Sequence, residues 1–325
     1  MTGTTDPEAT LDDAAEPPLR GSAVFLWGVG GALVGAVVVF ADFGSWTHDQ
    51  RKFLETGPPL LWATLICAQT AAWAVAIPVL RRLRLGLEHK WNPRILLTAA
   101  SLEVVVAAGA IGGAVAPNLA DWESFDYLAH RAWKISLLGV VESLAAVYGL
   151  VGMWRIYAEL RTTLRAGRIG LGHLERYREL QGKLQLLIGV LGATLGLVIL
   201  AVGAERNAVD AYGKRLCGPG GSCDTHFPSE YVLVYGFYFT ALLAFAYAPV
   251  QLALVTLGRR MREAAAPTAD LLKPGADVAA WQGKQAALDE ILDLKTGTAS
   301  SFRAALAVLT PLIGSLTGLL FGTGG

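Results

Sequence analysis

Long apolar runs that end at charged residues or prolines constrain this chain more than any other feature. A helix needs about 20 mostly apolar residues to cross the roughly 30 Å hydrocarbon layer of a bilayer, where a non-helical backbone would leave its polar groups unsatisfied. Six runs meet this requirement, at residues 23–41, 60–80, 95–116, 135–154, 184–203 and 231–257. The sequence therefore predicts an all-α integral membrane protein, a polytopic helix bundle of six spans.

The composition agrees with this fold class and excludes several functions. Of the 325 residues, 53% are hydrophobic and 17% are charged, whereas a soluble domain carries about 25% charged residues. The 27 Lys and Arg residues balance the 27 Asp and Glu residues, so no positive surplus is available for a nucleic-acid backbone. The sequence contains no cysteines and histidines at zinc-site spacing, no His-Glu-x-x-His zinc motif and no Gly-x-Ser-x-Gly nucleophile motif. We expect no nucleic-acid partner, no metal, no cofactor and no enzymatic activity.

Lys and Arg residues gather in alternate connections between the runs, and this asymmetry predicts the orientation. The connections after the second, fourth and sixth runs hold most of the bases, so the positive-inside rule places them in the cytoplasm together with the N-terminus. Arg outnumbers Lys, and Ala and Gly are abundant, which is typical of a bacterial genome rich in G and C. We expect the plasma membrane of a bacterium.

Four segments follow from these boundaries. They are a disordered acidic cytoplasmic tail (1–21), the six-span bundle (22–258), a cytoplasmic linker with an amphipathic helix near 277–295 (259–303) and a C-terminal hydrophobic segment (304–325). The last segment is only marginally long enough to cross, and Pro311 interrupts its hydrogen-bond ladder. We favour a seventh span over a re-entrant half-helix that returns to the cytoplasm.

Small residues spaced one helical turn apart predict close helix packing. The Gly-x-x-x-Gly pairs are Gly31 and Gly35, Gly109 and Gly113, Gly192 and Gly196, and Gly314 and Gly318. The last segment adds a small and hydroxylated stripe of Ala307, Thr310, Gly314 and Thr317. Such faces let helix backbones approach one another in lipid. Packing within one chain is the default meaning, and a homo-oligomer contact is the alternative.

Two cysteines fall in the connection before the last of the six runs, which the charge asymmetry places outside the cell. Cys217 and Cys223 flank the sequence Gly-Pro-Gly-Gly-Ser. Disulfides persist in oxidising compartments, and the glycines and proline favour a tight return. We predict a disulfide between them, the alternative being two unpaired surface thiols.

Two carboxylic acids interrupt the apolar spans, Glu103 in the third and Glu142 in the fourth. The helical rise places them about 8 Å apart along the membrane normal on neighbouring antiparallel helices. An acid at this depth must be protonated, paired or facing water. The alternative to a shared functional site is a structural hydrogen bond, with Ser143 among the possible partners. Gln69 could join the same polar patch.

Tyr235 and Tyr238 lie one turn apart in the sixth run, deeper than the membrane interface. Aromatic packing explains such residues more often than a wet path does, so both interpretations stay open for them. Together with Glu103, Glu142 and Gln69, they make up the predicted path for an ion or substrate. The sequence therefore predicts a channel or transporter that moves protons or small cations past intramembrane carboxylates.

The long cytoplasmic connection between the fourth and fifth runs supports a different function. Its bases include Arg161, Arg165, Arg168, Arg176 and Arg178. These could contact anionic lipid headgroups or an acidic partner, or they could serve only as the topological signal. The alternative function is a membrane-embedded signalling or scaffold protein that docks a soluble partner through this loop and the amphipathic helix.

Overall fold

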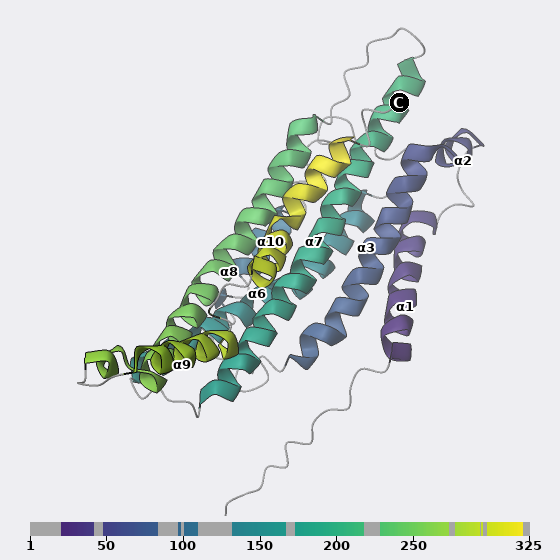
Figure 1. Ribbon diagram of the computed structural model, residues 1–325. Coiled ribbons are helices and arrows are strands. Elements are labelled where there is room, and N and C mark those ends of the chain that lie inside the picture. Colours follow the sequence, from purple (N-terminus) through teal and green to yellow (C-terminus); the bar gives the residue numbers. More distant parts are fainter. Residues whose placement is uncertain are drawn as a thin grey trace, which may run out of the picture.

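The computed structural model is an elongated bundle of helices (Figure 1). It describes residues 21–41, 48–83, 97–98, 101–109, 132–166, 173–217, 228–272, 277–292, 294 and 298–320. Every regular element in these ranges is helical. The elements are α1 (Gly21–Phe40), α2 (His48–Leu54), α3 (Gly57–Arg82), α6 (Ala132–Ala166), α7 (Leu174–Cys217), α8 (Ser229–Ala265), η4 (Thr268–Leu272), α9 (Val278–Ile291) and α10 (Thr298–Leu320).

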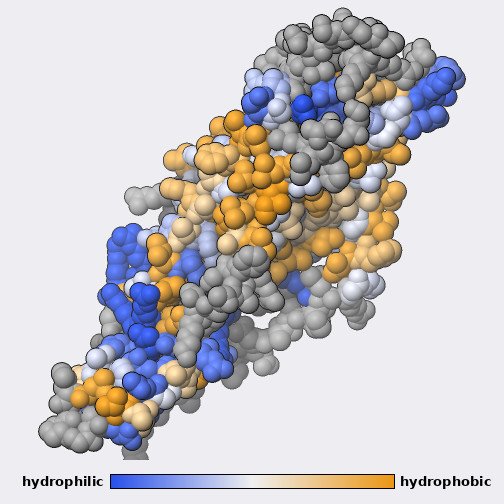
Figure 2. Space-filling view, turned by 45° about the horizontal axis from the view of Figure 1, so that its top comes forward, coloured by the Kyte–Doolittle hydropathy of each residue, from blue (hydrophilic) through white to orange (hydrophobic). Residues whose placement is uncertain are grey.

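Five helices of the described residues are long and apolar enough to cross a membrane: α1, α3, α6, α7 and α8. Apolar side chains form a broad band between two hydrophilic ends of the molecule (Figure 2). The predicted all-α class is therefore confirmed, and its apolar helices suit a membrane; the predicted six spans and seventh segment stay a prediction. The predicted third run, 95–116, lies largely outside the described residues, and its described parts, 97–98 and 101–109, are helical.

Local sequence explains where the long helices begin and end. Two prolines open α3, where the missing N–H groups would have no helical partner in any case. α6 stops one residue before Gly167, a helix breaker. α7 has 44 residues, and at 1.5 Å per residue it is about 66 Å long. It continues well beyond both ends of the predicted apolar run 184–203.

Glycines bring α1 against α3. A Cβ atom added to Gly31 would lie 2.4 Å from the Thr70 carbonyl oxygen, and one added to Gly35 would lie 2.8 Å from the Cys67 Cα atom. These contacts leave no room for a side chain. The first Gly-x-x-x-Gly pair therefore packs within the chain.

α10 packs against α7 and α8 in the same manner. A Cβ atom on Gly192 would lie 2.3 Å from the Ala307 carbonyl oxygen, and one on Gly196 would lie 2.4 Å from Thr310 Cγ2. Gly236 of α8 faces Ser315 in the same way. Three residues of the predicted stripe, Ala307, Thr310 and Gly314, thus contact α7. α10 is one continuous helix that runs beside α7 toward the end of the bundle where α2 lies (Figure 1).

α9 crosses the opposite end of the bundle (Figure 1). Its first turn is capped by Asp277, whose side chain accepts hydrogen bonds from the Ala279 and Ala280 N–H groups. At its other end, the Tyr177 hydroxyl of α7 donates to the Leu292 carbonyl at 3.1 Å. Arg262 of α8 pairs with Asp289 at 2.9 Å. We call this end of the molecule the α9 end and the other the α2 end.

Two sequence predictions fall outside the described residues. The acidic tail does so up to Arg20. The predicted disulfide does so because Cys223 is not described, while Cys217 is the last residue of α7. Both stay predictions.

Candidate functional site

A small cavity lies inside the bundle, enclosed by α3, α6, α7, α8 and the helical residues 101–109. Its volume is about 50 Å³. Most of its lining is apolar, and the polar side chains that line it are Gln69, Trp73, Glu142, Ser143, Glu205 and Tyr235. The cavity therefore gathers most of the buried polar side chains of the membrane-spanning helices into one place.

Helical periodicity positions these side chains. On α7, Leu195, Val198, Val202 and Glu205 line the cavity, and their spacing of three or four residues places them on one helix face. The same spacing brings Ile66, Gln69 and Trp73 of α3 and Gly139, Glu142 and Ala146 of α6 to the cavity. A polar residue in each buried face thus points into the bundle interior.

Glu142 and Gln69 are paired at the centre of the site. The side-chain amide Nε2 of Gln69 donates a hydrogen bond to Glu142 Oε2. Both side chains are buried, with exposed fractions of 6%. The other carboxyl oxygen of Glu142, Oε1, has no hydrogen-bond partner among the described residues. One half of this carboxyl group is therefore available to a water molecule, a proton or a cation.

Ser143 joins Glu103 to the same site. Its hydroxyl oxygen lies 2.5 Å from Glu103 Oε1 and 2.6 Å from the Val140 carbonyl oxygen. A serine hydroxyl has one proton to donate, and a carbonyl oxygen can only accept. The hydroxyl donates to Glu103 Oε1, and the Val140 carbonyl oxygen competes for the same proton. Ser143 thus links the carboxyl group of Glu103 to the cavity that Ser143 itself lines.

Glu205 is the site residue that sequence reasoning missed. As the first charge after the apolar run 184–203, Glu205 indicates the end of a span, but α7 continues through it. Glu205 is only 2% exposed, and its Oε1 atom has no hydrogen-bond partner in the described part of the chain. The apolar residues Ala204, Ala208, Val209 and Tyr212 that surround it in sequence are also buried. Their helical spacing is the signal that could have identified Glu205 as an inward-facing acid.

The unpartnered polar atoms around the cavity indicate that it holds water. Trp73 Nε1 offers a donor, and Glu142 Oε1 and Glu205 Oε1 offer acceptors, all buried and without a partner among the described residues. Buried polar groups in proteins are nearly always hydrogen-bonded, often to internal water. A volume of about 50 Å³ exceeds the 10–15 Å³ or so that one water molecule requires. Tyr235 lines the same cavity as Glu142 and Glu205.

Tyr238 points elsewhere. Its hydroxyl donates to the Val105 carbonyl oxygen at 2.7 Å, and its ring lies against Gly109. The ring also packs edge-on against Phe239, with centroids 5.1 Å apart. Of the five predicted path residues, Gln69, Glu142 and Tyr235 line the cavity, Glu103 adjoins it through Ser143, and Tyr238 is a packing residue.

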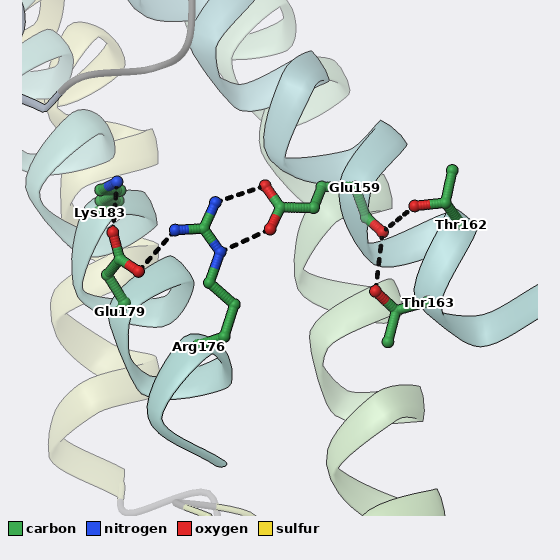
Figure 3. A network of polar contacts seen from close by, with 6 residues as sticks. All are labelled: Glu159, Thr162, Thr163, Arg176, Glu179 and Lys183. Carbon is green, nitrogen blue, oxygen red and sulfur yellow. Dashed lines mark hydrogen bonds and ion pairs between the residues drawn. The ribbon is translucent and has the colours of Figure 1, made fainter. Parts of the chain in front are cut away.

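Part of the basic loop is engaged within the chain. Arg176 pairs with Glu159 of α6 at 2.5 Å and with Glu179 of its own helix at 2.5 Å, and Lys183 extends this network to the other oxygen of Glu179 (Figure 3). Arg178 donates to the Ile291 carbonyl at the end of α9. Arg176 and Arg178 belong to the basic loop that the sequence predicts as a docking site for a soluble partner. In the structure, both side chains bind other parts of the chain. Arg161 and Arg165 are exposed, and Arg168 lies outside the described residues.

The fold and the cavity define a class: an all-α membrane protein with three acidic side chains gathered at one polar site between its helices. Comparisons with protein-family models, curated proteins and solved structures found no match. Function must therefore be argued from the site.

Proposed function

We propose that this protein is a channel or transporter that moves protons, or small cations, past the carboxyl groups of Glu142, Glu205 and Glu103. The observation that carries the proposal is the cavity lined by Glu142 and Glu205. Both are buried, and each has an oxygen without a hydrogen-bond partner among the described residues. Ionisable residues within membrane spans face bundle interiors or water-filled cavities and mark ion pathways.

The order of the residues along the helices supports a relay. α7 runs from the α9 end to the α2 end and α3 and α6 run the other way, so Glu205 lies toward the α2 end of the cavity (Figure 1). Gln69 and Glu142 follow deeper in the bundle, and Ser143 leads from there to Glu103. Water molecules between Glu205 and Glu142 and between Glu142 and Ser143 would complete a chain of groups that can each accept and donate a proton. The amide of Gln69 fixes Glu142 in place while leaving its second oxygen available.

Transport should depend on the carboxyl group of Glu142. We expect Glu142→Gln to reduce flux to the level of protein-free vesicles, because an amide keeps the size and polarity of the side chain but cannot release a proton or bind a cation. The measurement uses reconstituted vesicles. One arm follows an internal pH-sensitive dye under a pH gradient, and the other follows uptake of radioactive sodium at constant pH.

Glu230→Gln is the matched control. It removes one carboxylate near the start of α8, where Glu230 is exposed to solvent, and flux should match that of the wild-type protein. If Glu142→Gln transports at the wild-type rate in both arms while its helical content is unchanged, the proposal fails. A loss in one arm only identifies the transported ion.

The direction of the chain across the bacterial plasma membrane belongs to the same proposal. We infer that the α9 end faces the cytoplasm. The described Arg residues on either side of the α6–α7 connection lie at this end, as do Arg259, Arg260 and Arg262 of α8. The third apolar run and α10 then complete seven spans, and the segment from Cys217 to Cys223 faces the oxidising side.

Alkylation tests the predicted disulfide. The chain has three cysteines, so in denaturant we expect one alkyl adduct, on Cys67, without reductant and three adducts after reduction. The Cys217→Ser variant should show two adducts in both conditions. Three adducts on the unreduced wild-type protein would contradict the disulfide. After reduction, a membrane-impermeant maleimide should label Cys217 and Cys223 in intact cells only if this loop is outside.

A further inference from the structure

A groove on the surface of the bundle lies between α6 and α8, toward the α9 end. Its volume is about 490 Å³. One wall consists of α8 residues from Phe245 to Thr256, and the other of Tyr157, Arg161 and Leu164 of α6. The α8 wall is about 16 Å long at 1.5 Å per residue. The groove is separate from the carboxyl cavity, with which it shares no lining residue.

The two walls differ in polarity at the same level of the bundle. Phe245 and Leu252 of α8 are 72% and 68% exposed, which is costly in water and favourable against lipid chains. α6 and α8 run in the same direction, and Arg161 lies beside this apolar wall. The charged part of α6 therefore begins where α8 still presents an apolar surface.

Two cationic groups lie near the α9 end of the groove: Arg161 lines it, and Arg260 adjoins it through Leu164. Arg161 makes no hydrogen bond or ion pair with the described residues, and its side chain is exposed. Arg260 of α8 donates from Nη1 to the carbonyl oxygen of Leu164, a groove residue, at 2.9 Å. A guanidinium group has five N–H donors, so this contact uses only part of the capacity of Arg260. The end of the groove thus offers N–H donors and positive charge to an anion.

We propose that this groove binds an anionic phospholipid, with an acyl chain along Phe245, Pro249 and Leu252 and the phosphate at Arg161 and Arg260. An apolar trough ending at two guanidinium groups complements an amphiphile with an anionic head. Basic pockets between membrane helices recognise anionic headgroups for this reason. A soluble ligand would leave Phe245 and Leu252 uncovered, and an acidic protein would not reach apolar side chains within the span.

Native mass spectrometry of the detergent-purified full chain tests this proposal, with phosphatidylglycerol and phosphatidylcholine of the same acyl chains as probes. Arg161→Gln should weaken phosphatidylglycerol binding about fivefold, the loss expected for one base near the headgroup. Its effect on phosphatidylcholine should be much smaller. Arg161→Lys should retain the preference for the anionic lipid, because a point charge suffices for a phosphate.

Arg165→Gln is the matched control, since Arg165 lies one turn away, is also exposed and does not line the groove. It should leave phosphatidylglycerol binding unchanged. Ala248→Trp places a ring in the groove at an exposed position and should weaken binding of both lipids. Equal effects of Arg161→Gln and Arg165→Gln would overturn the proposal in favour of general surface charge. Unchanged lipid binding by Ala248→Trp together with loss of a dimer would overturn it in favour of a second copy of the chain.

Discussion

Gly192→Val should lower the free energy of unfolding by about 1–3 kcal/mol, the range for overpacking a tight contact. A Cβ atom at this position would meet the Ala307 carbonyl group of α10, at 2.3 Å from its oxygen and 2.9 Å from its carbon. Both atoms belong to the backbone, so no side-chain rotation can relieve the clash. α10 must shift away from α7, and the contacts of Gly196 and Gly236 with α10 are lost with it. Thermal unfolding in detergent measures the effect.

Gly189→Val provides the control on the same helix. Gly189 lies one turn from Gly192, and nothing lies within 4 Å of a Cβ atom built there. Both variants carry the same change in helix propensity, so their difference isolates the contact with α10. We expect Gly189→Val to unfold near the wild-type temperature. Equal destabilisation by the two variants would contradict the packing of α10 on α7.

Glu205→Leu should make the protein more stable and abolish transport. The Glu205 carboxyl is 2% exposed, and its Oε1 atom has no partner in the described residues, so leucine of similar size removes an unsatisfied polar group. Removal of such an unsatisfied buried group should raise the free energy of unfolding by about 1–3 kcal/mol. The relay, however, loses its member nearest the α2 end. Thermal unfolding and vesicle flux, measured on the same preparation, report the two opposite effects.

Thr194→Val is the matched control for a buried polar residue on α7. The Thr194 hydroxyl bonds to carbonyl groups of its own helix and does not line the cavity, so flux should persist. If Glu205→Leu instead destabilises the protein and transports normally, Glu205 has a structural role. Measuring thermal unfolding and flux together therefore distinguishes a role of Glu205 in transport from a role in folding.

The sequence predicted the spans well because hydrophobic length is a local property. α1, α3 and the apolar parts of α6, α7 and α8 follow from runs that can be read one at a time. The stripe on α10 was predicted too, since Ala307, Thr310 and Gly314 repeat at helical spacing. Gly192 was predicted as a packing residue as well, but its pairing with α10, and that of Gly236, depends on how the three helices are arranged.

The candidate site was predicted in part for a related reason. Depth follows from counting residues along a helix, so Glu103 and Glu142 could be assigned to one patch. Gln69 was a possible further member, and the structure pairs it with Glu142. The direction in which a side chain points depends on how each helix is rotated in the bundle. Tyr235 and Tyr238, one turn apart, diverge for this reason, the first toward the cavity and the second toward Val105. Glu205 was missed because the first charged residue after an apolar run predicts the end of a span, whereas α7 continues past this residue.

The distribution of prolines gives the bundle a stiff axis. α3, α8 and α10 each contain one internal proline, Pro78, Pro249 and Pro311, and each removes one rung of a hydrogen-bond ladder. α7, which touches all three, contains none over its whole length. Bending caused by proline is therefore expected in α3, α8 and α10 and not in α7. Glu205 lies on α7, so we expect the site to open and close by movement of the neighbouring helices relative to a fixed Glu205.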